Sequence, residues 1–385
     1  MSEACLSVLT CLQAHTGRAS IARWGLRALT RLLVTASHEE RKALQLELGK
    51  AGACQTVVGA MKDHANNAEV QQSGAVSIGL LAVDDAANSK ALADEGAFEV
   101  IASALRKFTV DRILRSAAAV TIAALATFSE NEGAIAASNA LGIVVELLSD
   151  NIDQPPIVLA ILTAIGGLAR QHGVHFSAVG ACEAVVQALN AYADDLDVQR
   201  SCVQALSMLP GNEEVNSRLC AADPGPGVIR AMRSFPADAN IQLHGIVIVT
   251  KLEIGRNAYS RHLLDLGSCE LVVAALNQCM HSPLRITVAL SALCVLICHS
   301  GYCDNLGPTC ATAVEAVDAY PDHDLVAKNG LSAIRHLSSS SAANCALLLR
   351  CGALETVAAA ARRYPQSAQL LSNADDVIAK LKSVQ

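Results

Sequence analysis

One pattern of apolar and polar positions recurs along the chain. Residues 96–105 read GAFEVIASAL, residues 180–189 read GACEAVVQAL and residues 267–276 read GSCELVVAAL. Each copy opens on a glycine and continues with apolar residues at helical spacing. A phrase that returns at a fixed interval predicts a repeat architecture, because one unit cannot bury its apolar face without the next.

The first position of the phrase serves as an anchor for the whole chain. Successive anchors lie 44, 43, 41, 43, 44, 41 and 44 residues apart. Glycine, asparagine and aspartate tolerate left-handed backbone or cap a helix, so they predict a break between two helices. Pro308 departs from this rule, although Gly307 precedes it. The anchors are Gly52, Gly96, Asn139, Gly180, Asp223, Gly267, Pro308 and Gly352.

Each unit contains three helical segments around its anchor. A short segment such as 88–95 precedes the anchor, an apolar helix such as 98–108 follows it, and a longer third helix such as 111–127 comes after a polar turn. In that third helix, Ile113, Ala117, Val120 and Ala124 recur at helical spacing. No segment shows the alternation of a β-strand.

Local details carry further predictions. Asn88, Asn131 and Asn344 each stand eight residues before an anchor, where we expect helix N-caps. The extra segment HEERK at 38–42 is expected to lengthen a loop. The chain begins inside a second helix, Ala4 to Leu12, which suggests a truncated first repeat. The more polar segment 367–383 is expected to form a terminal cap.

The period and the slots point to one superfamily. A repeat of about 40–47 residues with two or three helices is typical of HEAT and armadillo solenoids. The Asn and Gly slots and third-helix endings such as VTIAALA (120–126) resemble the armadillo pattern over essentially the whole chain. This resemblance implies an all-α fold, a right-handed α-solenoid of about eight armadillo units of 41–44 residues. The units are most similar to the armadillo region of leucine-rich-repeat kinases and to protist armadillo proteins.

We therefore predict a single armadillo-repeat solenoid over residues 1–385. The N-terminal partial and first unit span 1–51, and the C-terminal cap spans 352–385. Successive units lie between them at 52–95, 96–138, 139–179, 180–222, 223–266, 267–307 and 308–351.

Composition narrows the classes of function. A net charge of −7 and a pI near 5.9 speak against partners such as nucleic acid or an anionic membrane surface. The 14 cysteines contain no C-x-x-C pair, which favours a reduced intracellular protein that uses thiols as small apolar groups. We expect a cytoplasmic location, with the nucleus as an alternative. The uncharged segment 154–169 is too short to span a bilayer comfortably.

The resemblance also places a binding surface on the third helices. Importin-α and β-catenin hold an extended peptide with an Asn near the end of each third helix, and importin-α adds a Trp four residues earlier. The matching slots here contain no asparagine and no tryptophan, which disfavours a nuclear-import adaptor. The predicted partner-binding residues on this concave surface are Arg23, Arg27, Arg31, Gln72, Val76, Leu80, Val120, Ala124, Thr163, Gly167, Arg200, Gln204, Met208, Val247, Lys251, Ser291, Val295, Ser332 and His336.

The predicted surface is small and apolar in its middle and basic at its N-terminal end. Such a groove suits a peptide or an amphipathic helix that carries acidic residues near the arginines. The alternative interpretation is that the small residues reflect tight helix packing and the arginines form a solvated face. We treat the chain as a monomer.

Two clusters invite a metal reading and are interpreted otherwise. Segment 294–310 contains Cys294, Cys298, His299, Cys303 and Cys310, but its spacing is not that of a structural zinc site. We expect buried or incidental thiols there. His172 and His175 are interpreted as solvated loop histidines, and we predict no metal and no cofactor.

No catalytic constellation is present in the sequence. The chain is therefore interpreted as a scaffold or adaptor without enzymatic activity that binds a partner segment on its third helices. Two alternatives stay open. One is the regulatory armadillo arm of a larger enzyme such as a kinase. The other is a membrane-tethered armadillo trafficking factor, for which Cys5 and Cys11 are the acylation candidates because the chain begins Met-Ser.

Overall fold

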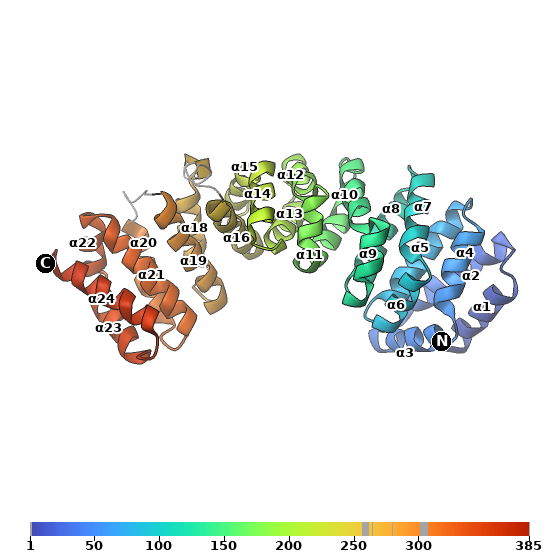
Figure 1. Ribbon diagram of the computed structural model, residues 1–385, viewed down its shortest axis with the longest axis horizontal. Helices are drawn as coiled ribbons and strands as arrows, with labels where there is room; N and C mark the ends of the chain where they lie inside the picture. Colours follow the sequence, from blue (N-terminus) through green and yellow to red (C-terminus); the bar gives the residue numbers. More distant parts are fainter. Residues whose placement is uncertain (1, 256–261, 264, 279, 301–306, 385) are drawn as a thin grey trace. The chain divides into compact units, whose positions relative to one another are not determined.

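In the computed structural model, the described part of the chain consists of helices and contains no strand (Figure 1). The structure describes every residue except 1, 256–261, 264, 279, 301–306 and 385. Contacts divide the chain into two compact units, Met1–Ala191 with Met208–Pro210, and Tyr192–Ser207 with Gly211–Gln385. The predicted all-α class is confirmed, and the boundaries of a single solenoid stay a prediction.

Unit 1 contains the helices of the first repeats and the start of the next. Their bounds are α1 Ser2–Ala14, α2 Ala19–Thr35, α3 His38–Lys50, α4 Ala53–Asp63, α5 Ala68–Ala82, α6 Ala86–Asp94, α7 Ala97–Lys107, α8 Arg112–Ala126, the 3₁₀ turn η1 Ser129–Asn131, α9 Glu132–Ser138, α10 Ala140–Asp150, α11 Pro155–Ala178 and α12 Ala181–Ala191.

Unit 2 continues the same alternation of short, medium and long helices. Their bounds are α13 Leu196–Met208, α14 Glu213–Ala222, α15 Gly225–Ser234, α16 Ala239–Gly255, α18 Ser268–Gln278, α19 Pro283–Ser300, α20 Gly307–Ala319, α21 Asp324–Ser340, α22 Ala342–Arg350, α23 Ala353–Arg363 and α24 Ala368–Lys382.

Left-handed backbone marks the anchors, as the sequence pattern predicts. Gly52 has a φ of 84°, and a second helix begins at the next residue. Asn139 reaches a φ of 53° and Asp223 a φ of 51°, so a non-glycine residue takes the same conformation. At Pro308 the second helix α20 instead starts one residue earlier, at Gly307. The residues in this conformation at anchors are Gly52, Gly96, Asn139, Gly180, Asp223, Gly267 and Gly352.

Third helices of neighbouring repeats pack on one another in parallel. In unit 1 the order is α2, α5, α8 and α11, and in unit 2 it includes α16, α19, α21 and α24. An ion pair joins Arg23 to Glu69 near the starts of α2 and α5, and Thr30 meets Ser77 at 2.9 Å further along. The buried face of α2 carries leucines such as Leu29, each worth about 1.5–3 kcal/mol of burial.

The N-cap prediction is wrong for Asn88 and Asn344, which lie inside α6 and α22, helices capped by other residues. Asn131 does stand at the N-cap position of α9, but its side chain makes no capping hydrogen bond. The side chain of Asp85 caps α6 by accepting a hydrogen bond from the backbone N–H of Asn88. Asn88 is buried and donates 2.9 Å to the carbonyl of Gln45 in the preceding repeat. Asn131 is also buried and donates to the carbonyl of Leu125 at 2.7 Å. Both side-chain amides thus satisfy backbone carbonyls of an adjacent helix, within α3 and near the end of α8.

The segment 38–42 is helical and does not lengthen a loop, which corrects the second local prediction. It forms the first turn of α3, where Ser37 and Glu40 build a capping box. The hydrogen bonds from Ser37 lower the pKa of Glu40 below its ordinary value. Such a box stabilises a helix start by satisfying two otherwise unpaired amide groups. The extra residues therefore extend a first helix.

Helix α11 is longer than the sequence segment from which it was predicted. Its 24 residues are apolar enough to cross a membrane by length and composition, while 56% of the apolar window is buried in the protein. Two bent helix pairs meet the same criteria only when each pair is counted as one span. His172 leaves the helical conformation at φ −114°, so α11 joins a third helix to the following first helix. The expectation of no membrane partner stays a prediction.

Cysteines occupy equivalent buried slots in several repeats. Cys54 and Cys310 each stand two residues after an anchor, and their thiols point to the carbonyls of Asn88 and Asn344. Burial raises the pKa of Cys54 to about 11 and that of Cys310 to about 12. Burial also raises the pKa of the Cys202 thiol. Among the described cysteines, Cys11 is the exposed one.

Candidate functional site: an apolar groove with an arginine-rich end

The predicted partner-binding residues all lie on third helices. None of them is buried, because each side chain faces away from the packed side of its helix. Arg23, Arg27 and Arg31 lie on α2, Gln72, Val76 and Leu80 on α5, Val120 and Ala124 on α8, Thr163 and Gly167 on α11, Arg200, Gln204 and Met208 on α13, Val247 and Lys251 on α16, Ser291 and Val295 on α19, and Ser332 and His336 on α21.

A hollow of about 680 Å³ crosses α5, α8 and the start of α11 in unit 1. We call it the apolar groove, because most of its lining is aliphatic. It brings together four of the predicted residues, two from α5 and two from α8. The lining consists of Val76, Gly79, Leu80, Val83, Ile113, Ser116, Ala117, Val120, Thr121, Ala124, Pro156 and Ile157, together with Arg41 and Arg112.

Helix α8 carries two apolar stripes on opposite sides, and one of them lines the groove. The buried stripe contains Leu114 and Ile122, which are at most 1% exposed. The other stripe contains Ile113, 63% exposed, and Val120, 52% exposed. A helix that needs only one apolar face for packing presents a second one to the solvent here. The packing of the repeats therefore leaves this second face uncovered.

A second hollow of about 420 Å³ adjoins the groove, since Val76 and Ile113 line both. We call it the arginine hollow. Trp24, the chain's single tryptophan, lies beside it and is 56% exposed. The guanidinium carbons of Arg23 and Arg27 lie 4.8 Å and 5.6 Å from its ring centre. The lining consists of Arg23, Arg27, Thr30, Arg31, Glu69, Gln72, Ser73, Val76 and Ile113.

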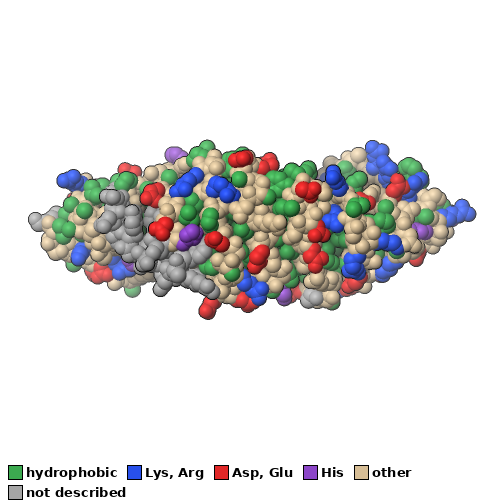
Figure 2. Space-filling view, turned by 90° about the horizontal axis from the view of Figure 1, so that it is seen from above, with side chains coloured by type: hydrophobic (Ala, Val, Ile, Leu, Met, Phe, Trp, Pro, Cys, Tyr) green, Lys and Arg blue, Asp and Glu red, His purple; other side chains and the backbone are tan. Residues whose placement is uncertain are grey.

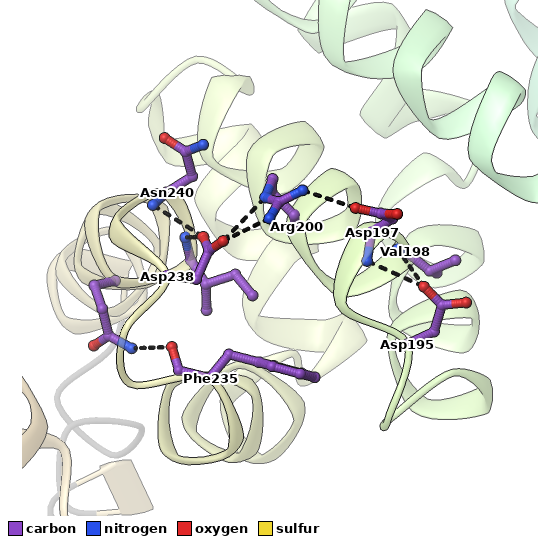
Figure 3. A network of polar contacts seen from close by, with 9 residues as sticks. Asp195, Asp197, Val198, Arg200, Phe235, Asp238 and Asn240 are labelled. Atoms are coloured by element: carbon purple, nitrogen blue, oxygen red, sulfur yellow. Dashed lines mark hydrogen bonds and ion pairs between the residues drawn. The ribbon is translucent and has the colours of Figure 1, made fainter.

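Some of the predicted residues form bridges within the protein. Arg23 pairs with Glu69 at 2.7 Å, and Gln72 donates to Asp111 at 2.6 Å, so both link one third helix to the next repeat. Arg200 on α13 donates to Asp238 at 2.7 Å and to Asp197 at 2.8 Å (Figure 3). These side chains stabilise the stacking of repeats, and this limits their availability to a partner.

The Asp238 carboxylate has two structural roles (Figure 3). It accepts hydrogen bonds from Arg200, and its other oxygen accepts from the amides of Asn240 and Ile241 at the start of α16. Burial acts to raise the pKa of Asp238, but these hydrogen bonds and the charge of Arg200 outweigh it and hold the pKa below its ordinary value. The hydrogen bonds to Asp238 in turn raise the pKa of Arg200 above its ordinary value.

The remaining predicted residues lie outside the two hollows. Lys251 donates to the carbonyl of Ser207, and His336 contacts the guanidinium of Arg335 at 3.1 Å. Burial, reinforced by the charge of Arg335, lowers the pKa of His336. On the face drawn in Figure 2, charged side chains of both signs are scattered among apolar and uncharged ones. The structure therefore gathers the predicted residues of α2, α5 and α8 into one site, whereas those on α11, α13, α16, α19 and α21 line neither hollow.

Among the described residues, no group of three or more His, Cys, Asp or Glu side chains is arranged to hold a metal ion. Cys294 is half-buried, and its thiol points to the carbonyl of Asn329. Cys303 and the side chains of Cys298 and His299 lie outside the described residues. His172 is buried in α11 and shares a 3.0 Å hydrogen bond with the carbonyl of Ala126, so the solvated-loop interpretation is wrong for it.

Several groove residues are absent from the predicted set. Arg41 was missed because the segment 38–42 was interpreted as a loop, whereas α3 carries this arginine to the groove. Ile113 belongs to the same helical stripe as Val120 in the sequence, so the signal was present, but this residue was not included in the predicted set. Arg112 and Ile157 carry no such signal, because only the packed repeats bring them to the groove.

Comparisons with known proteins settle the fold. No family model and no curated protein matches the sequence. An engineered protein has a TM-score of 0.72 at 18% identity, over 99% of this chain and 95% of that one. Beta-catenin, from a structure titled for a phosphorylation switch in its interaction with cadherin, has a TM-score of 0.69 at 14% identity, over 99% of this chain and 83% of that one. The fold is the armadillo-repeat fold.

A designed armadillo repeat protein also matches, with a TM-score of 0.48 at 17% identity, over 63% of this chain and 99% of that one. The predicted armadillo fold is confirmed by the match to beta-catenin. The closer similarity to leucine-rich-repeat kinases and protist proteins stays a prediction. The binding role of the predicted partner-binding residues also stays a prediction.

Proposed function

We propose that this armadillo chain is a protein-interaction scaffold without enzymatic activity, and that its partner binds the apolar groove and the arginine hollow. The armadillo fold of the chain and of beta-catenin supports a protein-binding role in general. The observation that carries the proposal is the exposed apolar stripe of α8. A soluble protein gains nothing in folding from leaving Ile113 and Val120 exposed, whereas a partner would bury them.

We also propose a cytoplasmic location, with the nucleus as the alternative, on the basis of the cysteine pattern of the sequence. The roles as an arm of a larger enzyme or as a membrane-tethered factor stay predictions. No described feature of the groove favours either one over the scaffold.

The experiment that tests the scaffold proposal compares two matched substitutions. Val120→Glu places a charge in the groove, and Val34→Glu places the same charge on α2 outside both hollows. The two valines are 52% and 56% exposed, so both variants are expected to fold equally well. Affinity capture from lysate should lose one or more proteins with Val120→Glu and retain them with Val34→Glu. Identical captured sets for all three chains would contradict the proposal.

A further inference from the structure

The lining of the groove also indicates what kind of segment occupies it. We infer that the occupant is an amphipathic α-helix of a partner protein, lying across α5 and α8, with carboxylates along its flanks. This inference rests on the proposed function, because it names the partner class of the same site.

The first argument concerns the backbone of the occupant. An extended peptide needs groove side chains to pair its amide and carbonyl groups, since unpaired ones lose about 1–3 kcal/mol each on burial. The middle of this groove offers Val76, Leu80 and Val120 instead. Thr121 is polar, but its hydroxyl already donates to the carbonyl of Ala75 at 2.8 Å. A helix satisfies its own backbone groups and can enter such a lining without loss.

The second argument concerns the shape of the apolar contact. Val76 and Leu80 stand one turn apart on α5, and Val120 and Ala124 stand one turn apart on the neighbouring α8. Two parallel helices thus present a short double row of apolar side chains. A partner helix laid across these two helices meets the rows with its residues at i, i+3, i+4 and i+7.

The third argument is electrostatic. The two hollows are lined by Arg23, Arg27, Arg31, Arg41 and Arg112 and by a single acid, Glu69, in a chain of net charge −7. Glu69 already pairs with Arg23. No ion pair joins the other four arginines to a carboxylate within the described residues. A partner that covers this surface must therefore bring negative charge to it.

The arginines also have positions that suit the flanks of a helix. Arg112 is the first residue of α8. Arg41 lies one turn before Gln45 on α3, and Gln45 donates to the carbonyl of Val83, just past the C-terminal end of α5. Because the third helices run parallel, these two arginines mark opposite edges of the groove. The Nε atom of Arg41 is buried and has no hydrogen-bond partner in the described structure. An acid on each flank of the bound helix would pair with them.

The test uses a displayed library of random peptides of about 18 residues, long enough for about five helical turns. The library is selected on the full chain, and each enriched peptide is then tested against Val120→Glu. Peptides that lose binding there are the groove-dependent set. We expect this set to carry apolar residues at i, i+3, i+4 and i+7 with an excess of Asp and Glu beside them. We also expect a synthetic member to gain helical circular dichroism when the chain is added.

Charge reversal then tests the two edges of the groove. The double variant Arg41→Glu, Arg112→Glu should weaken a groove-dependent peptide about tenfold or more. The control Arg350→Glu, Arg362→Glu changes the net charge equally at exposed positions on other helices and should change affinity less than twofold. A peptide with Lys in place of its flanking acids should regain affinity for the first double variant, which shows that the variant is folded.

The outcomes separate this inference from the proposed function. Groove-dependent peptides with period-two alternation, with basic flanks, or with full affinity after a central proline is introduced would overturn the helix while leaving a binding groove. A library in which no enriched peptide responds to Val120→Glu would overturn both.

Discussion

At the residue scale, Asp238 shows how one side chain can both start a helix and join two repeats. One oxygen accepts from the amides of Asn240 and Ile241, and the other accepts from Arg200. An aspartate just before a third helix is a common N-cap residue, so this role was accessible from the sequence, although it was not predicted above. The sequence does not show the pairing with Arg200, because 38 residues separate the two and only the stacking of repeats brings them together.

The two roles of Asp238 can be separated by substitution. Asp238→Asn keeps an N-cap acceptor and loses the charge, so we expect a local stability loss of about 1 kcal/mol. Asp238→Ala loses both and should cost about 2 kcal/mol or more. Hydrogen exchange of α13 and α16 measures the difference. Equal losses for the two variants would mean that the cap contributes nothing.

A second residue-scale prediction concerns the pH dependence of stability. Burial lowers the pKa of His244. The positive charges of Arg285 and Lys251 lower it further, and the negative charge of Asp238 partly opposes these effects. The unfolded histidine takes up a proton near pH 6.5, while the folded one stays neutral to lower pH. The unfolded state then binds more protons, so the unfolding free energy falls as pH drops from about 7 to about 5.

Replacing His244 by glutamine should therefore make the stability of the chain less sensitive to acid. The thermal midpoints of the natural chain and of His244→Gln are compared at about pH 7.5 and about pH 5.5. The natural chain should lose more than the variant between the two conditions. The same loss in both proteins would show that His244 does not contribute to it.

At the scale of elements, the breaks between helices were the most predictable feature. Gly, Asn and Asp recur at the anchors, and the structure puts left-handed backbone there. Segment 38–42 was harder to predict, because HEERK is polar on all sides and lacks the apolar stripe from which a helix is predicted. Its capping box from Ser37 to Glu40 was the available signal. Missing it removed Arg41 from the predicted site.

Two glycines with different backbone conformations, one at an anchor and one inside a helix, test why the anchors need glycine. Gly52 has a φ of 84°, and a methyl group there would meet side chains only at 3.4 Å or more. Gly52→Ala should thus cost about 1–2 kcal/mol from backbone conformation alone. Gly167 lies inside α11 with open space around it, so Gly167→Ala should stabilise by up to about 1 kcal/mol. Thermal unfolding of both variants gives the sign, and a stabilising Gly52→Ala would refute the argument.

At the scale of the whole molecule, the repeat period predicts the fold class, and the armadillo resemblance predicts which helices carry the exposed surface. The lining of the groove was only partly accessible, since Arg112 and Ile157 reach it from different repeats. Repeats that contact only their neighbours also predict how damage spreads. A local loss should stay within a few repeats.

A large core deletion in unit 2 tests this locality. Leu331 on α21 is fully buried, and Leu331→Ala should cost about 2–5 kcal/mol. Hydrogen exchange should accelerate in α21 and in α19 and α24, which pack on it, while α5 and α8 of unit 1 keep their protection. Faster exchange throughout the chain would mean that it opens as a single cooperative body.

The buried cysteines have a practical consequence for such measurements. A thiol reacts as the thiolate, and the raised pKa values of Cys54, Cys202 and Cys310 suppress that form while the surrounding helices are folded. Each of these residues lies in a different repeat, so alkylation followed by peptide mass spectrometry would time the opening of each repeat separately. The buried cysteines thus serve as built-in probes of local unfolding. The exposed Cys11 gives the alkylation rate of an unprotected thiol for comparison.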